Sequence, residues 1–338
     1  MKQKIECPFC DGNANLQKEA REVNYRKEEF KIAAHFYKCE KCAEEFTTTD
    51  ADTISLMQVH NQYREKNNIP FPEEIAATRE KYGLAASKMS EVLGLGANGY
   101  SNYENGEIPT PAYGNLISAA SEPQTFMRML DKAKPIFSEP AFKKAKEKVT
   151  QLIPSEDAHK HLCQILNVYY QPNNFTGYKK IEPAKIAHLV THFIQHSKPE
   201  FNDKLKLNKQ LFFADFTHYK NYGESITGLS YRAIKYGPVP ANYDNIFAYL
   251  ETEKFISPQF IKQPNGGARE VFISESEFDQ KLFSEEEKET LYIISAKFSD
   301  MSTWDIVELS HSEKAWKELE AKKELIGYQD YAFELVAV

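Results

Sequence analysis

The sequence has no apolar run long enough to span a bilayer, and its first residues, Met1 to Glu6, lack the apolar segment of a secretion signal. We therefore expect a cytoplasmic protein with no membrane partner. Cationic residues are also few, because 42 Lys and Arg stand against 49 Asp and Glu, for a formal net charge of −7. This balance argues against a protein whose whole surface is basic and binds nucleic acids. Any contact with DNA must come from a local surface, helped by dimerisation.

The motifs of common catalytic sites are missing as well, since there is no Walker motif, no G-x-S-x-G and no plausible Cys–His pair. Asp215 and His218 lie about one helical turn apart and could form an acid–base pair. However, Asp215 follows the apolar run 211–214, which favours a buried carboxylate. Its partner would be Lys209, Lys235 or a backbone amide. The sequence gives no case for catalysis, and we expect no enzyme.

Cysteine is scarce, with five in 338 residues, but four of the five form two pairs. These are Cys7-Pro-Phe-Cys10 and Cys39-Glu-Lys-Cys42. Each C-x-x-C offers two thiolates from one tight turn, and two pairs fill the tetrahedral shell of Zn²⁺. We predict a structural zinc site with no open position. The alternatives are a redox pair, ordinary buried thiols, or His35 in place of one thiolate.

The length of the chain predicts several domains, because 338 residues exceed what one hydrophobic core usually supports. Between the cysteine pairs, polar and aromatic residues alternate as in a small sheet, and residues 55–66 have a helical pattern. The fold class predicted is multidomain and mainly α with small sheets. The predicted domains are a four-cysteine zinc domain at 1–66, a helix-turn-helix domain at 67–135, a linker or connecting helix at 136–155, and an α+β domain at 156–338.

Residues 67–135 have the pattern of short helices separated by Gly and Pro. The central two helices are predicted at 85–93 and 97–105, with Gly94 in the turn between them. Helix, short Gly-containing turn and helix form the helix-turn-helix pattern. The remaining predicted boundaries are Pro72 and Gly83 around the first helix, Gly106 after the third, and Pro111 and Pro123 at the starts of the fourth and fifth.

The segment from Leu84 to Gly106, and above all its ending Tyr103-Glu104-Asn-Gly106, resembles the Cro/repressor-like helix-turn-helix family. Together with the cysteine pairs, it resembles the MqsA-type antitoxins, which join a zinc domain to a helix-turn-helix that binds DNA as a dimer. The resemblance implies base contacts from Asn98 and, in place of an arginine, from Asn102. The expected DNA-binding residues are Lys88, Asn98, Tyr100, Ser101 and Asn102. A helix-turn-helix used only for dimerisation is the alternative.

The C-terminal half contains four stretches that occur in the order of a known antitoxin domain. They are Lys206–Asp215, Ile226–Ala233, Lys235–Pro240 and Leu309–Trp316. This half resembles the Panacea (SocA-like) domain, which implies neutralisation of a cognate toxin by direct contact. The toxin-binding residues expected are Tyr219, Tyr222, Tyr231 and Lys235.

Several details of this half are also predicted. Helices are expected at 159–171, 183–196, 204–222, 284–297, 302–309 and 312–321, and strands within 226–240 and 260–274. Lys206 and Lys209 are expected to be solvated or to snorkel. Gly237–Pro240 should be a stiff turn, Asn265–Gly267 a hairpin turn, and Cys163 a small core residue.

Two functions remain open from the sequence. The first is a homodimeric antitoxin of a type II toxin–antitoxin system, which binds its toxin and represses its own operon at a double-stranded DNA operator. The second is a stand-alone zinc-finger and helix-turn-helix transcriptional regulator with a C-terminal sensor or interaction domain. In MqsA-type antitoxins the zinc domain holds the toxin, so both halves are candidates for that role.

Overall fold

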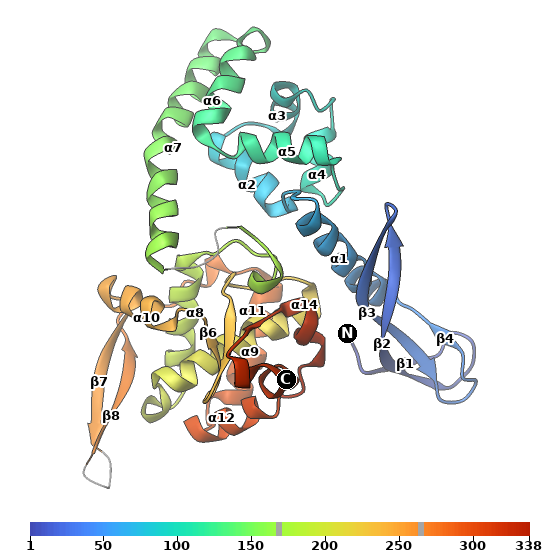
Figure 1. The fold of residues 1–338 in the computed structure, drawn as a ribbon, viewed down its shortest axis with the longest axis vertical. Coiled ribbons are helices and arrows are strands. Elements are labelled where there is room, and N and C mark those ends of the chain that lie inside the picture. The colour runs from blue at the N-terminus through green and yellow to red at the C-terminus, as the bar shows by residue number, and fades with distance from the viewer. Residues whose placement is uncertain (167–170, 263–266) are drawn as a thin grey trace. The chain divides into compact units, whose positions relative to one another are not determined.

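The computed structural model describes the backbone of residues 1–166, 171–262 and 267–338, and the side chains of these residues except 154–166 (Figure 1). Cys163 therefore lies outside the described side chains. The chain forms two compact units, residues 59–164 and residues 1–58 together with 165–338. Among the described residues, no helix has the length and apolar character needed to cross a membrane. The functional boundaries at residues 66, 135 and 155 stay predictions.

An antiparallel sheet with strand order β1-β2-β3-β4 begins the first unit. Its strands are β1 (Lys4–Glu6), β2 (Asn13–Tyr25), β3 (Glu28–Cys39) and β4 (Glu45–Phe46). Arg26 and Lys27 connect β2 to β3, and both have positive φ, 49° and 70°. Left-handed backbone at both central positions matches the twist of a tight hairpin. The small sheet expected between the cysteine pairs is confirmed.

Helix α1 (Thr49–Lys66) follows the sheet and begins six residues earlier than the pattern at 55–66 predicts. Thr48 explains the earlier start, because its hydroxyl accepts a hydrogen bond of 3.3 Å from the backbone N–H of Ala51. Asp50 and Asp52 in the first turn also favour a helix N-terminus. The boundary between the two compact units falls within this helix.

The second unit is all-helical, and prolines and glycines set its boundaries as predicted. Its helices are α2 (Pro72–Tyr82), α3 (Ala86–Leu93), α4 (Gly99–Glu104), α5 (Pro111–Ala120), α6 (Pro123–Lys132) and α7 (Glu139–Leu166). Gly83 and Gly94 follow α2 and α3 with φ of 67° and 68°, the left-handed conformation that ends many helices. In the core, the rings of Tyr82 and Phe126 stack at 4.0 Å.

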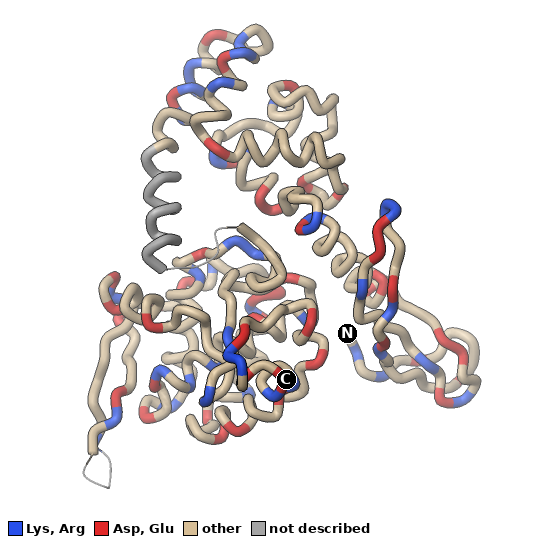
Figure 2. Tube along the Cα trace, in the orientation of Figure 1, with Lys and Arg blue, Asp and Glu red and all other residues tan. Residues whose placement is uncertain are grey.

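Residues 136–155, predicted as a linker or connecting helix, are mostly the first part of α7. Phe142, Ala145 and Val149 of this helix are buried in the core of the second unit. Most of this stretch is therefore helix rather than linker, and one face of α7 covers the short helices. The Lys and Glu residues of this stretch are exposed, and Figure 2 marks their positions along the chain.

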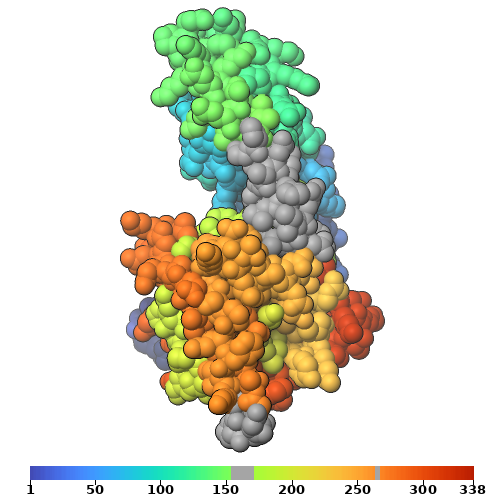
Figure 3. Space-filling view, turned by 90° about the vertical axis from the view of Figure 1, so that its left-hand side faces the viewer, coloured from blue at the N-terminus to red at the C-terminus, as the bar shows by residue number. Residues whose placement is uncertain are grey.

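The C-terminal part of the first unit has the α+β character predicted. Its helices are α8 (Pro183–Gln195), α9 (Lys204–Tyr222), α10 (Tyr243–Thr252), α11 (Glu285–Phe298), α12 (Thr303–His311), α13 (Lys314–Leu319) and α14 (Tyr328–Tyr331). A three-stranded sheet has the order β6-β5-β9, and β7 pairs with β8 as a separate hairpin. These strands are β5 (Tyr231–Ile234), β6 (Gly237–Pro240), β7 (Ile256–Lys262), β8 (Ala268–Ser274) and β9 (Leu325–Ile326). Figure 3 shows the β7–β8 hairpin, in orange, on one face of this part.

Three details differ from the sequence prediction or lie outside the structure. Helix α10 was not expected between the strands. Gly237–Pro240, expected as a stiff turn, is strand β6. Its two prolines are tolerated because β6 is an edge strand, where a missing N–H breaks no ladder. The β7–β8 pairing agrees with the predicted hairpin, but most of its turn falls within 263–266, outside the described residues.

Candidate functional site

The four paired cysteines meet at one end of the first sheet. Cys7 and Cys10 lie in the turn from β1 to β2, Cys39 ends β3, and Cys42 lies in the turn to β4. Their sulfur atoms all lie within 4.8 Å of one another. The distance is 3.7 Å from Cys7 Sγ to Cys42 Sγ and 3.5 Å from Cys10 Sγ to Cys39 Sγ. Four sulfurs at about 2.3 Å from a tetrahedral metal are about 3.8 Å apart, so the cluster fits one ion.

Backbone donors around one of the four sulfurs, that of Cys39, favour its thiolate form. Backbone N–H groups of Lys41 and Cys42 donate to Cys39 Sγ at 3.4 and 3.5 Å. Hydrogen bonds from Cys42 and Lys41 lower the pKa of Cys39 to about 6. A Cβ atom at Gly12 would lie 2.7 Å from Lys41 Cβ and 3.0 Å from Cys39 Sγ. The turn thus needs glycine to close around the sulfurs.

His35 is not part of this cluster. It lies on β3 opposite Lys18, and its ring contacts Phe333 with centroids 5.4 Å apart. Among the described residues, the group that could hold a metal comprises the four cysteines and not His35. The alternative in which His35 replaces a thiolate is therefore not supported.

In the helix-turn-helix, α4 occupies the position expected of the recognition helix. Asn98 precedes its first turn, and Asn102 lies one turn later. Both side chains are exposed, and Ser101 is partly exposed. Helix α4 carries no Lys or Arg (Figure 2). Asparagine and serine side chains can hydrogen-bond to base edges, and α4 offers no cation for a phosphate.

Two of the residues expected to bind DNA are engaged within the protein. Tyr100 is fully buried, and its hydroxyl donates a 2.7 Å hydrogen bond to the carbonyl of Ile75. It belongs to the core and cannot contact DNA, which corrects the prediction. Lys88 donates to Glu91 and to the carbonyl of Ile136 at 3.1 Å. Both side chains of the Lys88–Glu91 ion pair are partly exposed.

The ending Tyr103-Glu104-Asn-Gly106 has a structural role in this unit. Glu104 forms an ion pair with Arg79 of α2, at 2.5 Å, and both side chains are mostly shielded from solvent. Tyr103 is buried in the shared core. This ending therefore fixes α4 against α2 and sets the direction in which Asn98 and Asn102 point.

Asp215 of α9 is a buried structural carboxylate in the C-terminal part. It accepts hydrogen bonds of 2.9 Å from the backbone N–H groups of Ile226 and Thr227. The hydroxyls of Thr227 and Tyr231 donate to its other oxygen at 2.5 and 2.7 Å. The predicted pairing with a backbone amide is confirmed, whereas pairing with Lys209 or Lys235 is wrong.

Lys206 and Lys209 are buried completely, which corrects the expectation that they are solvated or snorkel. Lys206 Nζ donates to the carbonyls of Ser299 and Met301, at 3.2 and 2.8 Å. Lys209 Nζ donates to the carbonyl of Pro238 at 2.8 Å. Burial lowers the pKa of Lys206 to about 8 and that of Lys209 to about 7.

The residues expected to bind a toxin divide into buried and accessible ones. Tyr219 and Tyr231 are fully buried, so the prediction that they contact a partner is wrong for this structure. Tyr219 donates to Gln329, and Tyr231 donates to Asp215. Tyr222, partly exposed, donates to Glu289, and Lys235 is exposed.

An exposed aromatic pair adjoins Lys235. Tyr236 in the β5–β6 turn and Trp304 of α12 have ring centroids 6.1 Å apart, and they are 43% and 62% exposed. Lys235 Nζ lies 5.2 Å from the Tyr236 ring centroid. We call Lys235, Tyr236 and Trp304 the turn surface. Trp304 was missed from the sequence, although its polar neighbours Ser302 and Asp305 are a signal of exposure.

The stretches of the C-terminal half that resemble the Panacea domain meet beneath the turn surface. Lys209 holds the carbonyl of Pro238, and a Cβ atom at Gly237 would lie 2.6 Å from Lys209 Cε. Trp316 Nε1 donates to the carbonyl of Ile234 at 2.8 Å, and its ring stacks on His311. Residues far apart in sequence thus fix one hairpin turn.

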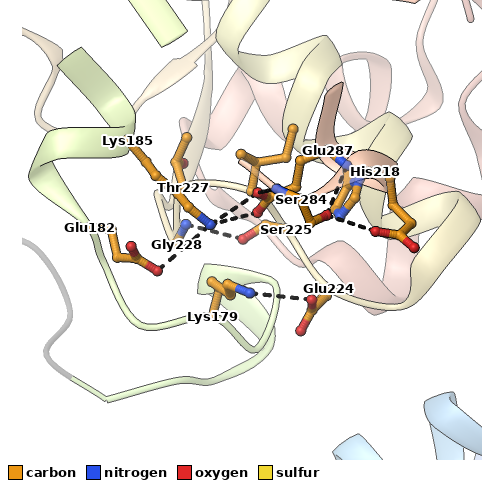
Figure 4. A network of polar contacts seen from close by, with 12 residues as sticks. Lys179, Glu182, Lys185, His218, Glu224, Ser225, Thr227, Gly228, Ser284 and Glu287 are labelled. Carbon is orange, nitrogen blue, oxygen red and sulfur yellow. Dashed lines mark hydrogen bonds and ion pairs between the residues drawn. The ribbon is translucent and has the colours of Figure 1, made fainter. Parts of the chain in front are cut away.

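A second polar network links α8, α9 and α11 (Figure 4). Lys185 Nζ lies 2.7 and 3.1 Å from the two carboxylate oxygens of Glu287, and both side chains are buried. His218 Nδ1 lies 3.0 Å from the hydroxyl of Thr290. Burial lowers the pKa of His218 to about 3. Since these groups pair with one another, the network holds the three helices together.

Comparison with known families agrees with this architecture. Residues 5–118 match the antitoxin component of bacterial toxin-antitoxin systems, MqsA. Residues 207–317 match the SocA-like antitoxin, Panacea domain. No curated protein matches the chain. The two resemblances expected from the sequence are confirmed, and so is the predicted fold class.

Proposed function

We propose that this chain, which joins an MqsA-like antitoxin segment to a SocA-like Panacea domain, is the antitoxin of a type II toxin–antitoxin system. It neutralises a cognate toxin by direct protein binding and represses its own operon by binding DNA as a homodimer. The pair of family matches carries the proposal, because both families are antitoxins and both lie on one chain.

Zn²⁺ is the metal proposed for the four-cysteine cluster. An all-thiolate site with tetrahedral spacing suits Zn²⁺, and a closed shell leaves no position for a substrate. Cys7, Cys10, Cys39 and Cys42 would hold the ends of β1 and β3 together. The bound metal would stabilise the fold of the sheet.

DNA binding is assigned to α4. The exposed Asn98 and Asn102 are proposed to contact base edges in the major groove, and Ser101 a phosphate or a base. Because α4 lacks cations, a single copy would bind weakly, and a dimer on a palindromic operator would double the contacts.

The turn surface is the proposed toxin contact of the Panacea domain. It presents two large exposed aromatic rings on a rigidly supported turn, and such aromatic residues dominate many interfaces. Lys235 adds a positive charge that favours a partner with an acidic rim. The accessible Tyr222 stays a secondary candidate.

Co-expression with the product of a toxin-like reading frame next to the gene for this chain tests the proposal. The full chain should restore growth, and Trp304→Ala should weaken toxin binding by about tenfold or more. Tyr292→Ala is the matched control, because Tyr292 is 75% exposed on α11 and lies outside the turn surface. Operator binding without any rescue of growth would favour the stand-alone regulator instead.

A further inference from the structure

Residues Leu335–Val338 are held against the C-terminal domain by two charged side chains. Glu313, almost fully buried, accepts hydrogen bonds from the backbone N–H groups of Val336 at 3.0 Å and Ala337 at 2.8 Å. Lys220 Nζ, at the end of α9, donates to the carbonyls of Leu335 at 3.0 Å and Val338 at 3.1 Å. All four of these contacts are made with the main chain of the segment.

The side chains of this segment alternate between buried and exposed. Leu335 and Ala337 are buried, at 5% and 3% exposure, whereas Val336 is 71% exposed. Such alternation is typical of an extended peptide lying on a surface. Main-chain hydrogen bonds provide the attachment, and pockets for alternate side chains select their size.

The charged groups of Glu313 and Lys220 need main-chain partners at this site. A buried carboxylate is costly unless donors satisfy it, and here the amides of Val336 and Ala337 each donate to one of its two oxygens. Burial raises the pKa of Glu313, and the amides of Val336 and Ala337 act against this rise. If the segment left, another extended peptide would satisfy the same two oxygens.

We propose that Glu313 and Lys220 form a receptor for an extended peptide, and that residues 335–338 are its built-in, displaceable ligand. The site takes a peptide with a Leu-sized apolar residue, an unrestricted residue and a small apolar residue in succession. An extended segment of another protein with this pattern competes with residues 335–338. The proposal concerns peptide binding alone and does not depend on the proposed antitoxin activity.

The first test uses the chain with residues 335–338 deleted. A fluorescently labelled peptide of residues 334–338 should bind this variant at least about tenfold more tightly than the intact chain, where the attached segment competes at high effective concentration. A peptide methylated at the backbone nitrogens of Val336 and Ala337 cannot donate and should not bind. Equal binding of the two peptides to the folded variant, or binding of neither, would overturn the proposal.

Two substitutions in the deletion variant check the receptor. Glu313→Gln removes one acceptor and should weaken peptide binding about tenfold, whereas Glu318→Gln, on the helix α13 that follows Glu313, should leave it unchanged. A peptide with Val336→Ser should bind like the original, because this side chain is exposed. Equal weakening by both substitutions would contradict the assigned role of Glu313.

Hydrogen exchange in the intact chain keeps the proposal testable if the deletion variant does not fold. Excess unlabelled peptide should displace the attached segment and accelerate exchange of the Val336 and Ala337 amides by about tenfold. The methylated peptide should have no effect. Exchange that does not respond to the unmethylated peptide would overturn the proposal.

Discussion

The side-chain amide of Gln329 donates a hydrogen bond of 2.8 Å to the side-chain oxygen of Gln58. Gln58, on α1, also exchanges two hydrogen bonds with the backbone of Ala33 on β3, at 2.8 and 2.9 Å. Gln329 accepts from the hydroxyl of Tyr219 on α9 at 2.8 Å. A chain of polar groups thus connects the four-cysteine sheet to the Panacea-type domain within one compact unit.

Replacing Gln58 should therefore destabilise the first unit. Gln58→Ala leaves the N–H and carbonyl of Ala33 and the amide of Gln329 without this partner, and we expect a loss of about 1–3 kcal/mol in unfolding free energy. Leu56→Ala, on the exposed face of the same helix, should cost less than about 0.5 kcal/mol. Urea denaturation followed by circular dichroism measures both. Similar losses of unfolding free energy in the two variants would contradict the stabilising role of the hydrogen bonds made by Gln58.

Removal of any one cysteine from the cluster should abolish stable metal binding. Fresh protein is expected to carry one zinc ion per chain, and Cys42→Ser should lose it and unfold the sheet, because metal binding and folding are coupled. Glu40→Gln is the control, since Glu40 is exposed in the same turn and pairs with Lys4. Elemental analysis measures the metal. Protein that folds fully with no metal would refute the assignment.

Substitutions on α4 should separate base contacts from core packing. Asn98→Ala and Asn102→Ala should each weaken operator binding by about 1–3 kcal/mol and relax base preference at one position. Asn105→Ala is the control, because this side chain bonds within the helix, to the carbonyl of Ser101. Half-sites should lie about 34 Å apart or a multiple of this. Mobility shifts that are unchanged for both variants would rule out these contacts.

Tyr100→Phe should lower stability and leave operator binding unchanged, in contrast to the substitutions of Asn98 and Asn102. The variant loses a buried hydrogen bond to Ile75, and its unfolding free energy should fall by about 1–2 kcal/mol. The folded variant should bind the operator as tightly as the unchanged protein, since Tyr100 is not exposed. Weakened DNA binding without a loss of stability would show that Tyr100 does contact DNA.

Acidification should destabilise the C-terminal domain through two buried histidines. Burial lowers the pKa of His192 to about 4 and that of His218 to about 3, whereas both titrate near 6.5 when unfolded. The unfolded chain therefore binds protons first as the pH falls. Stability that is present above about pH 6.5 is lost toward pH 4, by about 1 kcal/mol per histidine between pH 7 and 5.5.

Urea denaturation at a series of pH values measures this dependence. His192→Gln and His218→Gln should each flatten the slope between pH 7 and 5.5, because each removes one group whose pKa rises on unfolding. A slope that persists unchanged in the double variant would show that other groups are responsible.

The sequence by itself determined the features that depend on local geometry. A C-x-x-C pair places two thiolates in one turn, and the structure brings the two turns together as the spacing predicts. Prolines and glycines set the ends of the short helices from α2 to α6, because their backbone preferences act within a few residues. Asn98 and Asn102 are exposed, as the resemblance to the MqsA-type helix-turn-helix implies.

Only the tertiary structure decided which polar residues are buried. Helix α9 is surrounded by other elements on nearly all sides, so no amphipathic pattern marks an exposed face, and Lys206, Lys209 and Tyr219 are all buried in it. Lys206 is tolerated there because the carbonyls of Ser299 and Met301, about ninety residues away in the chain, accept its hydrogen bonds. A buried charge depends on such distant partners, and no local pattern encodes them.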